Sequence, residues 1–175
     1  MARRRAHHGS TGEAPQARRV ARSIRRFLRV ELRPLDESSD GLLTSLQQQD
    51  DVWEFIGSAA FAAYEPGNHV FVIVEGDIPV GFAGLFKSRA AGRDDFEILC
   101  ATRSDVQHRG VARRACQLLV DWALTTAEME RVIACIDASN QPARAIAAKL
   151  EMTELRTDSS NRIIYVKYRA EHTPS

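Results

Sequence analysis

The chain has 175 residues, of which 44% are hydrophobic and 27% are charged, so it can bury one core but is too short for two ordinary domains. Its 24 basic and 23 acidic residues nearly balance, which excludes a protein that is strongly basic or acidic throughout. The apolar runs are shorter than the roughly 18 residues of a membrane span, and the N-terminus has no signal-peptide pattern. We therefore expect a single cytoplasmic domain with no membrane contact.

Three cysteines, Cys100, Cys116 and Cys135, form no C-x-x-C pair and leave one residue unpaired. This spacing indicates neither a disulfide framework nor a zinc site, and it fits a reducing cytoplasm. We expect no bound metal.

Arginines are concentrated at the N-terminus. Residues 1–26 contain few large apolar side chains and cannot offset the entropy cost of ordering, so they predict a flexible basic arm. The arm either binds nucleic acid or the ribosome through its arginines, or is a solvated tail or a start codon assigned too early. Residues 27–170 form the expected domain and residues 171–175 a short tail.

The first half of the domain predicts strands on both sides of a helical region. Residues 30–34 alternate like a strand, and apolar residues over 42–56 recur at helical spacing, which predicts one or two amphipathic helices. The β-rich run 69–75 follows. Gly76-Asp77 then favours a tight turn into a partner strand over 80–86, so this pair is expected to be antiparallel.

The second half alternates strands and helices, which indicates an α/β fold. A strand is expected over 96–102, a long helix with one buried face over 111–123, and a buried strand over 132–136. Asn140 and Pro142 are typical of a helix start. The last strand candidates are 152–155 and 163–168.

The string Gln107–Ala112 lies between the strand over 96–102 and the start of the long helix. The first turn of a helix presents unpartnered N–H groups and the positive end of its dipole, which favour a phosphate. Gly110 lacks a Cβ and lets a diphosphate approach the backbone, and Ala112 adds little bulk. The alternative is an ordinary helix N-terminus.

This string, Gln-x-x-Gly-x-Ala, resembles the acetyl-CoA pyrophosphate loop of the GNAT N-acetyltransferase superfamily, Q/R-x-x-G-x-G/A. That family continues with a helix, a strand and an Asn-initiated helix ending in K-x-G-F, which correspond here to 131–136, Asn140 and 149–152. The resemblance covers about 30–168. It is closest to the branch of the ribosomal-protein N-terminal alanine acetyltransferases, through LRVELRPLDESSD, WEFIG and Glu97-Ile98.

The resemblance implies a mixed, largely antiparallel sheet flanked by helices, with acetyl-CoA in a cleft between two splayed central strands. It implies an acetyl-CoA-dependent N-acetyltransferase in which an amine attacks the thioester directly, without a covalent intermediate or a metal. The residues it implies for acetyl-CoA binding are Cys100, Ala101, Thr102, Gln107, His108, Arg109, Gly110, Val111, Ala112, Arg113 and Asn140.

Several polar residues of this region also fit a purely structural role. Asn140 is a preferred helix N-cap, and capping is compatible with a contact to the cofactor. Cys100 has no recognisable His-Asp partner, so we interpret its side chain as a small apolar group rather than a nucleophile. His69 and His108 are interpreted as structural or surface residues rather than bases.

Glu97 is the candidate catalytic base. It lies ten positions before Gln107, on the strand expected to lead to the thioester, where a carboxylate can take the ammonium proton directly or through a water. The alternative is that Glu97 is an exposed strand glutamate, in which case a water chain is the base or the acceptor reacts through its own neutral fraction.

The chain departs from the family pattern at two positions. Ala147 stands where many members have a tyrosine that acts as general acid, which excludes that acid here. Glu151 stands where glycine is usual, so we expect either a non-glycine residue in left-handed conformation or a slightly longer helix.

The acceptor is expected to be a primary amine, which arrives largely as a cation. Acidic residues expected near it would attract a cation, although they could equally serve solubility: Asp50, Asp51, Glu54, Asp94, Asp95 and Glu97. A protein or peptide N-terminus is the leading acceptor. A small amine (antibiotic, polyamine or amino acid), or a noncatalytic acyl-CoA-binding regulator, stays open, as does the choice of monomer or homodimer.

Overall fold

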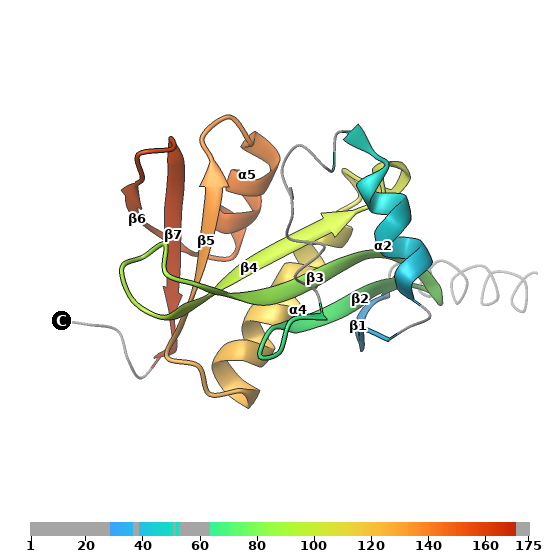
Figure 1. Ribbon diagram of the computed structural model, residues 1–175, viewed down its shortest axis with the longest axis horizontal. Coiled ribbons are helices and arrows are strands. Elements are labelled where there is room, and N and C mark those ends of the chain that lie inside the picture. The colour runs from blue at the N-terminus through green and yellow to red at the C-terminus, as the bar shows by residue number, and fades with distance from the viewer. Residues whose placement is uncertain (1–28, 37–38, 51, 53–63, 171–175) are drawn as a thin grey trace, which may run out of the picture.

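The structure, a computed structural model, describes residues 29–36, 39–50, 52 and 64–170 (Figure 1). The predicted arm over 1–26 and the tail over 171–175 lie outside these residues. Within the part of the chain that the structure describes, no helix combines the length and hydrophobicity needed to cross a membrane.

The strands of the described chain form one sheet. They are β1 (Val30–Pro34), β2 (His69–Glu75), β3 (Ile78–Ser88), β4 (Asp95–Thr102), β5 (Arg131–Asp137), β6 (Thr153–Thr157) and β7 (Arg162–Tyr168). The sheet has seven strands in the order β1-β2-β3-β4-β5-β7-β6. All neighbours are antiparallel except β4 and β5, which are parallel. The predicted mixed, largely antiparallel sheet is therefore confirmed.

The turn between β2 and β3 is the predicted hairpin. Gly76 has φ 69° and Asp77 has φ 123°, and positive φ values are what a tight hairpin turn requires. The ladder of β2 and β3 shifts register between Ile73 and Val74, an irregularity that the alternation of apolar residues did not indicate.

Helices cover both faces of the sheet (Figure 1). On one face, α4 (Val111–Asp121) and α5 (Gln141–Lys149) pack over the larger apolar cluster, in which Leu119 is fully buried. On the other face, α2 (Asp40–Gln47) packs against β3 and buries Leu46 completely. After α2, Asp50 and Val52 are also helical and Val52 is buried in the same cluster, whereas residues 51 and 53–56 of the predicted helical region lie outside the described residues.

Along β4 the side chains alternate between the two faces. Phe96, Ile98 and Cys100 belong to the cluster under α4, whereas Leu99 and Ala101 belong to the cluster under α2. Because successive strand residues point to opposite faces, Glu97 is on the α2 side of the sheet.

The helix that begins at Val111 is less regular than its apolar pattern predicts. It is α-helical to Asp121 and then continues as a π-helical turn over Trp122–Thr126. The Trp122 ring lies 5.3 Å from the rings of His69 and Phe71. His69 is thus an aromatic packing partner, as its structural interpretation predicts.

Candidate functional site

The two central strands, β4 and β5, meet at one point and then part. Their one pair of Cα partners in the described chain is Glu97 and Ile133, whereas β4 pairs with β3 along its whole length. Figure 1 shows the two strands diverging toward their carboxyl ends. Beyond Glu97, β4 therefore continues to Thr102 with one edge paired and the other edge open.

The open edge of β4 contains Cys100, Ala101 and Thr102. In an antiparallel pair, alternate residues direct their backbone N–H and C=O groups away from the partner strand, so part of the backbone over 98–102 faces the gap toward β5. An extended ligand can pair with such an edge as an added strand does. The three residues expected to hold the pantetheine arm therefore lie where this pairing is possible.

The Cys100 side chain packs toward α4. Its Sγ atom lies 4.0 Å from the carbonyl oxygen of Ala112. The contact with Cys116, together with burial, raises the pKa of the Cys100 thiol well above its ordinary value. Because the thiolate is the nucleophilic form, this supports the apolar interpretation of Cys100.

The string Gln107–Ala112 forms the turn that leads into α4. It follows a 3-10 turn at Ser104–Val106, and Gly110 is the N-cap of α4 with φ 81° and ψ 6°. Glycine adopts this left-handed conformation without steric cost. A Cβ on Gly110 would meet no described atom within 4 Å, so the space beside it is open.

The first turn of α4 offers backbone donors to this open space. The N–H of Arg114 bonds the Gly110 carbonyl at 3.0 Å, so the N–H groups of residues 111–113 precede the first intrahelical bond. The N-cap glycine has no side chain to accept from them. With the positive end of the helix dipole, these donors fit the diphosphate of acetyl-CoA.

Arg109 is held by the protein rather than projecting freely. Its Nη2 atom lies 3.0 Å from the carboxylate of Glu75, which is buried at the end of β2. Gln49 braces the same region, because its Oε1 accepts hydrogen bonds from the N–H and the hydroxyl of Ser104, both at 2.8 Å. The Arg109 side chain thus anchors the loop, and its contact with acetyl-CoA stays a prediction. His108 and Arg113 are exposed beside the loop.

Asn140 is the N-cap of α5. Its Oδ1 accepts a hydrogen bond from the N–H of Ala143 at 3.1 Å, and Pro142 occupies the first helical turn. The capping role is confirmed, and a contact with acetyl-CoA stays a prediction. At the other end of α5, Glu151 has φ 56°, so the expected left-handed non-glycine residue is present.

Glu97 is half-buried at the junction of β4 and β5. The hydroxyl of Ser88 donates a hydrogen bond to Glu97 Oε2 at 2.8 Å. On the other side of the junction, burial and then the charge of Glu97 raise the pKa of the Cys135 thiol to about 12. Cys135 therefore stays protonated at neutral pH.

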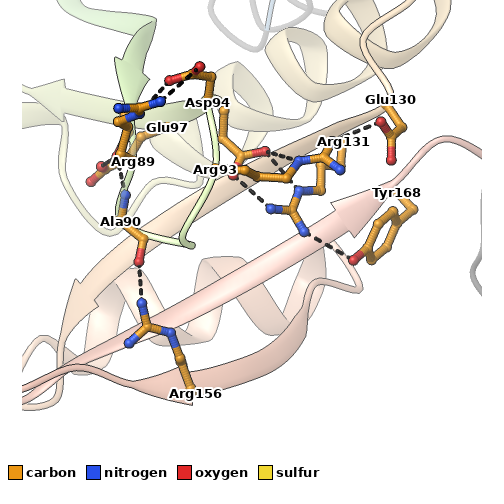
Figure 2. Close-up of polar contacts among 11 residues, drawn as sticks. Arg89, Ala90, Arg93, Asp94, Glu97, Glu130, Arg131, Arg156 and Tyr168 are labelled. Atoms are coloured by element: carbon orange, nitrogen blue, oxygen red, sulfur yellow. Dashed lines mark hydrogen bonds and ion pairs between the residues drawn. The ribbon is translucent and has the colours of Figure 1, made fainter.

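Two acidic neighbours of Glu97 do not have the expected cation-attracting role. Asp95 is buried and accepts hydrogen bonds from Arg131 at 2.8 and 2.7 Å (Figure 2). Asp94 is ion-paired with Arg89 at 2.6 Å. The expectation was wrong for both, because arginines of the same fold neutralise them. Asp51 and Glu54 lie outside the described residues.

Sequence reasoning missed several residues that shape the site. Glu75, Ser88 and Arg131 act through partners distant in the chain, and nothing local in the sequence indicates these pairs. Gly81 did carry a signal, since a glycine inside a strand often marks a close backbone approach. A Cβ on Gly81 would collide with the carbonyl oxygen of Ala101.

Comparisons with known proteins agree with this geometry. The model of the acetyltransferase (GNAT) domain matches residues 29–153. A search of curated protein sequences found no match.

Solved structures share the fold at low sequence identity. A domain from Methanocaldococcus jannaschii DSM 2661 has TM-score 0.67 and 14% identity, covering 80% of this chain and 98% of that one. An acetyltransferase from Agrobacterium tumefaciens str. C58 has TM-score 0.67 and 18% identity, and the match covers 80% of this chain and 91% of that one. A mutant of the spermidine N-acetyltransferase SpeG from Vibrio cholerae has TM-score 0.66 and 11% identity, and the match covers 82% of this chain and 95% of that one.

The family model covers most of the chain, and the parted central strands and the glycine-capped helix provide the matching site. The chain belongs to the GNAT acetyltransferase family and is an acetyl-CoA-dependent N-acetyltransferase.

Proposed function

We propose that the protein transfers the acetyl group of acetyl-CoA to the free amino terminus of a protein or peptide. One observation carries this proposal: the Glu97 carboxylate lies where β4 and β5 begin to part, and the anion-binding turn 107–112 lies beyond the other end of β4. The sequence resemblance to the ribosomal-protein N-terminal alanine acetyltransferases adds support.

In this proposal, each part of β4 and its following loop has a separate task. The N–H groups of residues 111–113 bind the diphosphate, and the open backbone edge over 100–102 holds the pantetheine arm and directs the thioester toward the junction. A backbone N–H of this edge would stabilise the thioester oxyanion. Asn140, at the start of α5, borders the same ligand.

Glu97 supplies the base. An α-amino group has a pKa of about 8 and a lysine side chain about 10.4, so both arrive largely protonated at neutral pH. The carboxylate accepts the ammonium proton directly or through a water, and the neutral amine then attacks the thioester carbon. The C–N bond forms, the C–S bond of the thioester breaks, and the departing CoA thiolate takes up the second proton that the nitrogen loses. The α-amino group gives up its proton more readily, which supports an N-terminus as the acceptor.

A small amine is the second candidate, because similar structures include a spermidine N-acetyltransferase from Vibrio cholerae. A polyamine carries several positive charges and would prefer a strongly negative surrounding. Around Glu97, the described carboxylates Asp94, Asp95 and Asp158 each pair with an arginine. This balance of charge supports an acceptor with a single ammonium group.

An acceptor screen tests the proposal. Thiol release from acetyl-CoA would be measured with peptides carrying each N-terminal residue, with the same peptides blocked at the N-terminus, and with spermidine and an aminoglycoside. We expect turnover with free peptides and none with blocked ones. Turnover confined to the small amines would make them the substrates, and binding without turnover of any amine would indicate a noncatalytic regulator.

A further inference from the structure

We infer that Ser88 is a positioning residue for Glu97: its hydroxyl holds one oxygen of the carboxylate, Oε2, at the end of a series of hydrogen bonds that begins at Arg156. This inference rests on the proposed role of Glu97 as the base. Ser88 itself does not touch the reacting atoms.

The hydrogen-bond chain crosses from the edge strand β6 to the central strand β4 (Figure 2). Arg156 Nη2 donates to the Ala90 carbonyl at 2.6 Å, and the Ala90 N–H donates to Ser88 Oγ at 3.3 Å. Ser88 then donates to Glu97 Oε2 at 2.8 Å. The four residues come from three separate segments of the polypeptide, so the hydrogen bond between Ser88 and Glu97 depends on the folded β3–β4 loop.

The direction of each bond follows from the groups involved. An ionised carboxylate only accepts and a backbone N–H only donates, whereas a hydroxyl does both. Because the Ala90 N–H donates to Ser88 Oγ, the hydroxyl proton remains for Glu97 Oε2. The serine is therefore oriented for the ionised form of the glutamate.

The sheet register explains why Ser88 reaches only one oxygen. In the β3–β4 ladder, Phe86 is opposite Glu97 and Ser88 is opposite Asp95, so Ser88 approaches Glu97 diagonally from one side. Phe86 is buried on the same face. The Ser88 hydroxyl therefore reaches Oε2 of Glu97.

The charged and titratable groups around Glu97 have partners of their own. On β7, Arg162 is within electrostatic reach of Glu97 but forms an ion pair with Asp158 at 2.9 Å. On β5, the neutral Cys135 thiol also forms a hydrogen bond with the Glu97 carboxylate, but a thiol is only a weak donor. The other nearby charged groups also have partners: Asp95 is ion-paired with Arg131 and Asp94 with Arg89, and Arg156 donates a hydrogen bond to the Ala90 carbonyl. Among the described residues, the Ser88 hydroxyl is thus the strong hydrogen-bond donor to this carboxylate.

Loss of the Ser88 hydroxyl should lower kcat. A charge-assisted hydrogen bond to a carboxylate fixes the orientation of that carboxylate. Without this bond at Oε2, the Glu97 carboxylate would sample more orientations, and fewer of them would direct it at the ammonium group of the acceptor.

The experiment measures kcat and KM separately with the amine identified by the acceptor screen, first a peptide with a free N-terminal alanine. Four variants are compared with the wild type. Ser88→Ala removes the hydroxyl and Ser88→Thr keeps it. Arg156→Gln breaks the hydrogen bond to the Ala90 carbonyl, and Glu97→Gln removes the proposed base. Arg89→Gln is the matched control, since Arg89 belongs to the same loop but pairs with Asp94 outside the hydrogen-bond chain. Calorimetry with acetyl-CoA and melting curves accompany each variant.

For Ser88→Ala we expect kcat to fall roughly 3- to 10-fold, with the acetyl-CoA affinity and the KM for the acceptor unchanged. Arg156→Gln should lower kcat by less, while Ser88→Thr and Arg89→Gln keep the wild-type kcat. If Glu97→Gln is inactive but Ser88→Ala and Arg156→Gln both keep the wild-type kcat, the inference fails and the proposed function stands. If Glu97→Gln keeps the wild-type kcat, the inference fails together with the proposed base, and acetyl transfer is judged by the screen alone.

Discussion

Gly110 and Gly92 have nearly the same backbone conformation in different surroundings. Their φ values are 81° and 86°, and a Cβ on either would meet no described atom within 4 Å. Gly110 is the N-cap of α4, beside the donors proposed for the diphosphate, whereas Gly92 is in the β3–β4 loop. Gly92 therefore controls for the strain of a side chain at positive φ.

We predict that Gly110→Asp lowers acetyl-CoA affinity by about 100-fold or more, because it places a negative charge where the helix N-terminus would bind an anion. Gly92→Asp should bind normally, and both variants should lose about 1 kcal/mol of stability through backbone strain. Calorimetry and melting curves measure the two effects. A folded Gly110→Asp protein with wild-type affinity would show that the diphosphate binds elsewhere.

Glu97→Gln keeps the shape of the side chain and removes its basicity. We predict a kcat loss of about 100-fold with acetyl-CoA affinity retained, since general-base catalysis contributes about that much. Glu154→Gln, an exposed change on β6, serves as control and should leave both quantities unchanged. An intact kcat and pH profile would leave a water chain as the base, and a lost cofactor affinity would assign Glu97 to the wrong half of the site.

At the residue scale, the sequence predicts groups whose role is local and misses those whose role depends on a distant partner. Gly110 and Asn140 act on the helix turn that follows them, so spacing alone predicts their positions. The ion pair of Arg109 with Glu75 was not predicted, because the two residues are 34 positions apart. Asp95 was misassigned for the same reason, with Arg131 36 positions away.

Among the strands, the ion pair of Asp95 and Arg131 joins the first residue of β4 to the first residue of β5. Both side chains are buried, with 1% and 8% of their surface exposed. The Asp95 carboxylate raises the pKa of the Arg131 guanidinium above its ordinary value, and Arg131 also donates to the Tyr168 hydroxyl at 3.2 Å. The pair thus fastens the strands next to their only bridge in the described chain, Glu97 and Ile133.

We predict that Asp95→Asn lowers the free energy of unfolding by about 3 kcal/mol, because it leaves the Arg131 charge buried without a counterion. Asp94→Asn is the matched control, since its pair with Arg89 is exposed and should contribute less than about 1 kcal/mol. Urea denaturation measures both variants. Equal, small losses would mean that the buried pair does not stabilise the strand junction.

At the element scale, hydrophobic period predicts the order and type of the strands and helices because each buries one face. Strands β2 to β5 and the helices α4 and α5 are confirmed in order and type. The period does not predict departures from regular geometry. The π-helical turn after Asp121 and the register shift in β2 depend on packing across the sheet, which no local pattern records.

For the whole molecule, we predict that deleting residues 1–22 leaves the melting temperature and acetyl-CoA affinity nearly unchanged. These residues carry too little apolar surface to join a core, and the described sheet begins only at Val30. Melting curves and calorimetry compare the full and shortened chains. A loss of several degrees would show that the arm packs on the domain, and salt-dependent RNA binding by the full chain alone would give it a function.

The bridge that joins β4 to β5 in the described sheet also has a mechanical consequence. Each side of the junction, β1 to β4 and β5 to β7, is an antiparallel ladder that satisfies its own backbone hydrogen bonds. Widening the angle between the two blocks would break at most one bridge, whereas bending either block would break a ladder. In terms of backbone hydrogen bonds, the line between β4 and β5 is therefore the weakest line of the described sheet, and the buried Asp95–Arg131 pair lies beside its one bridge.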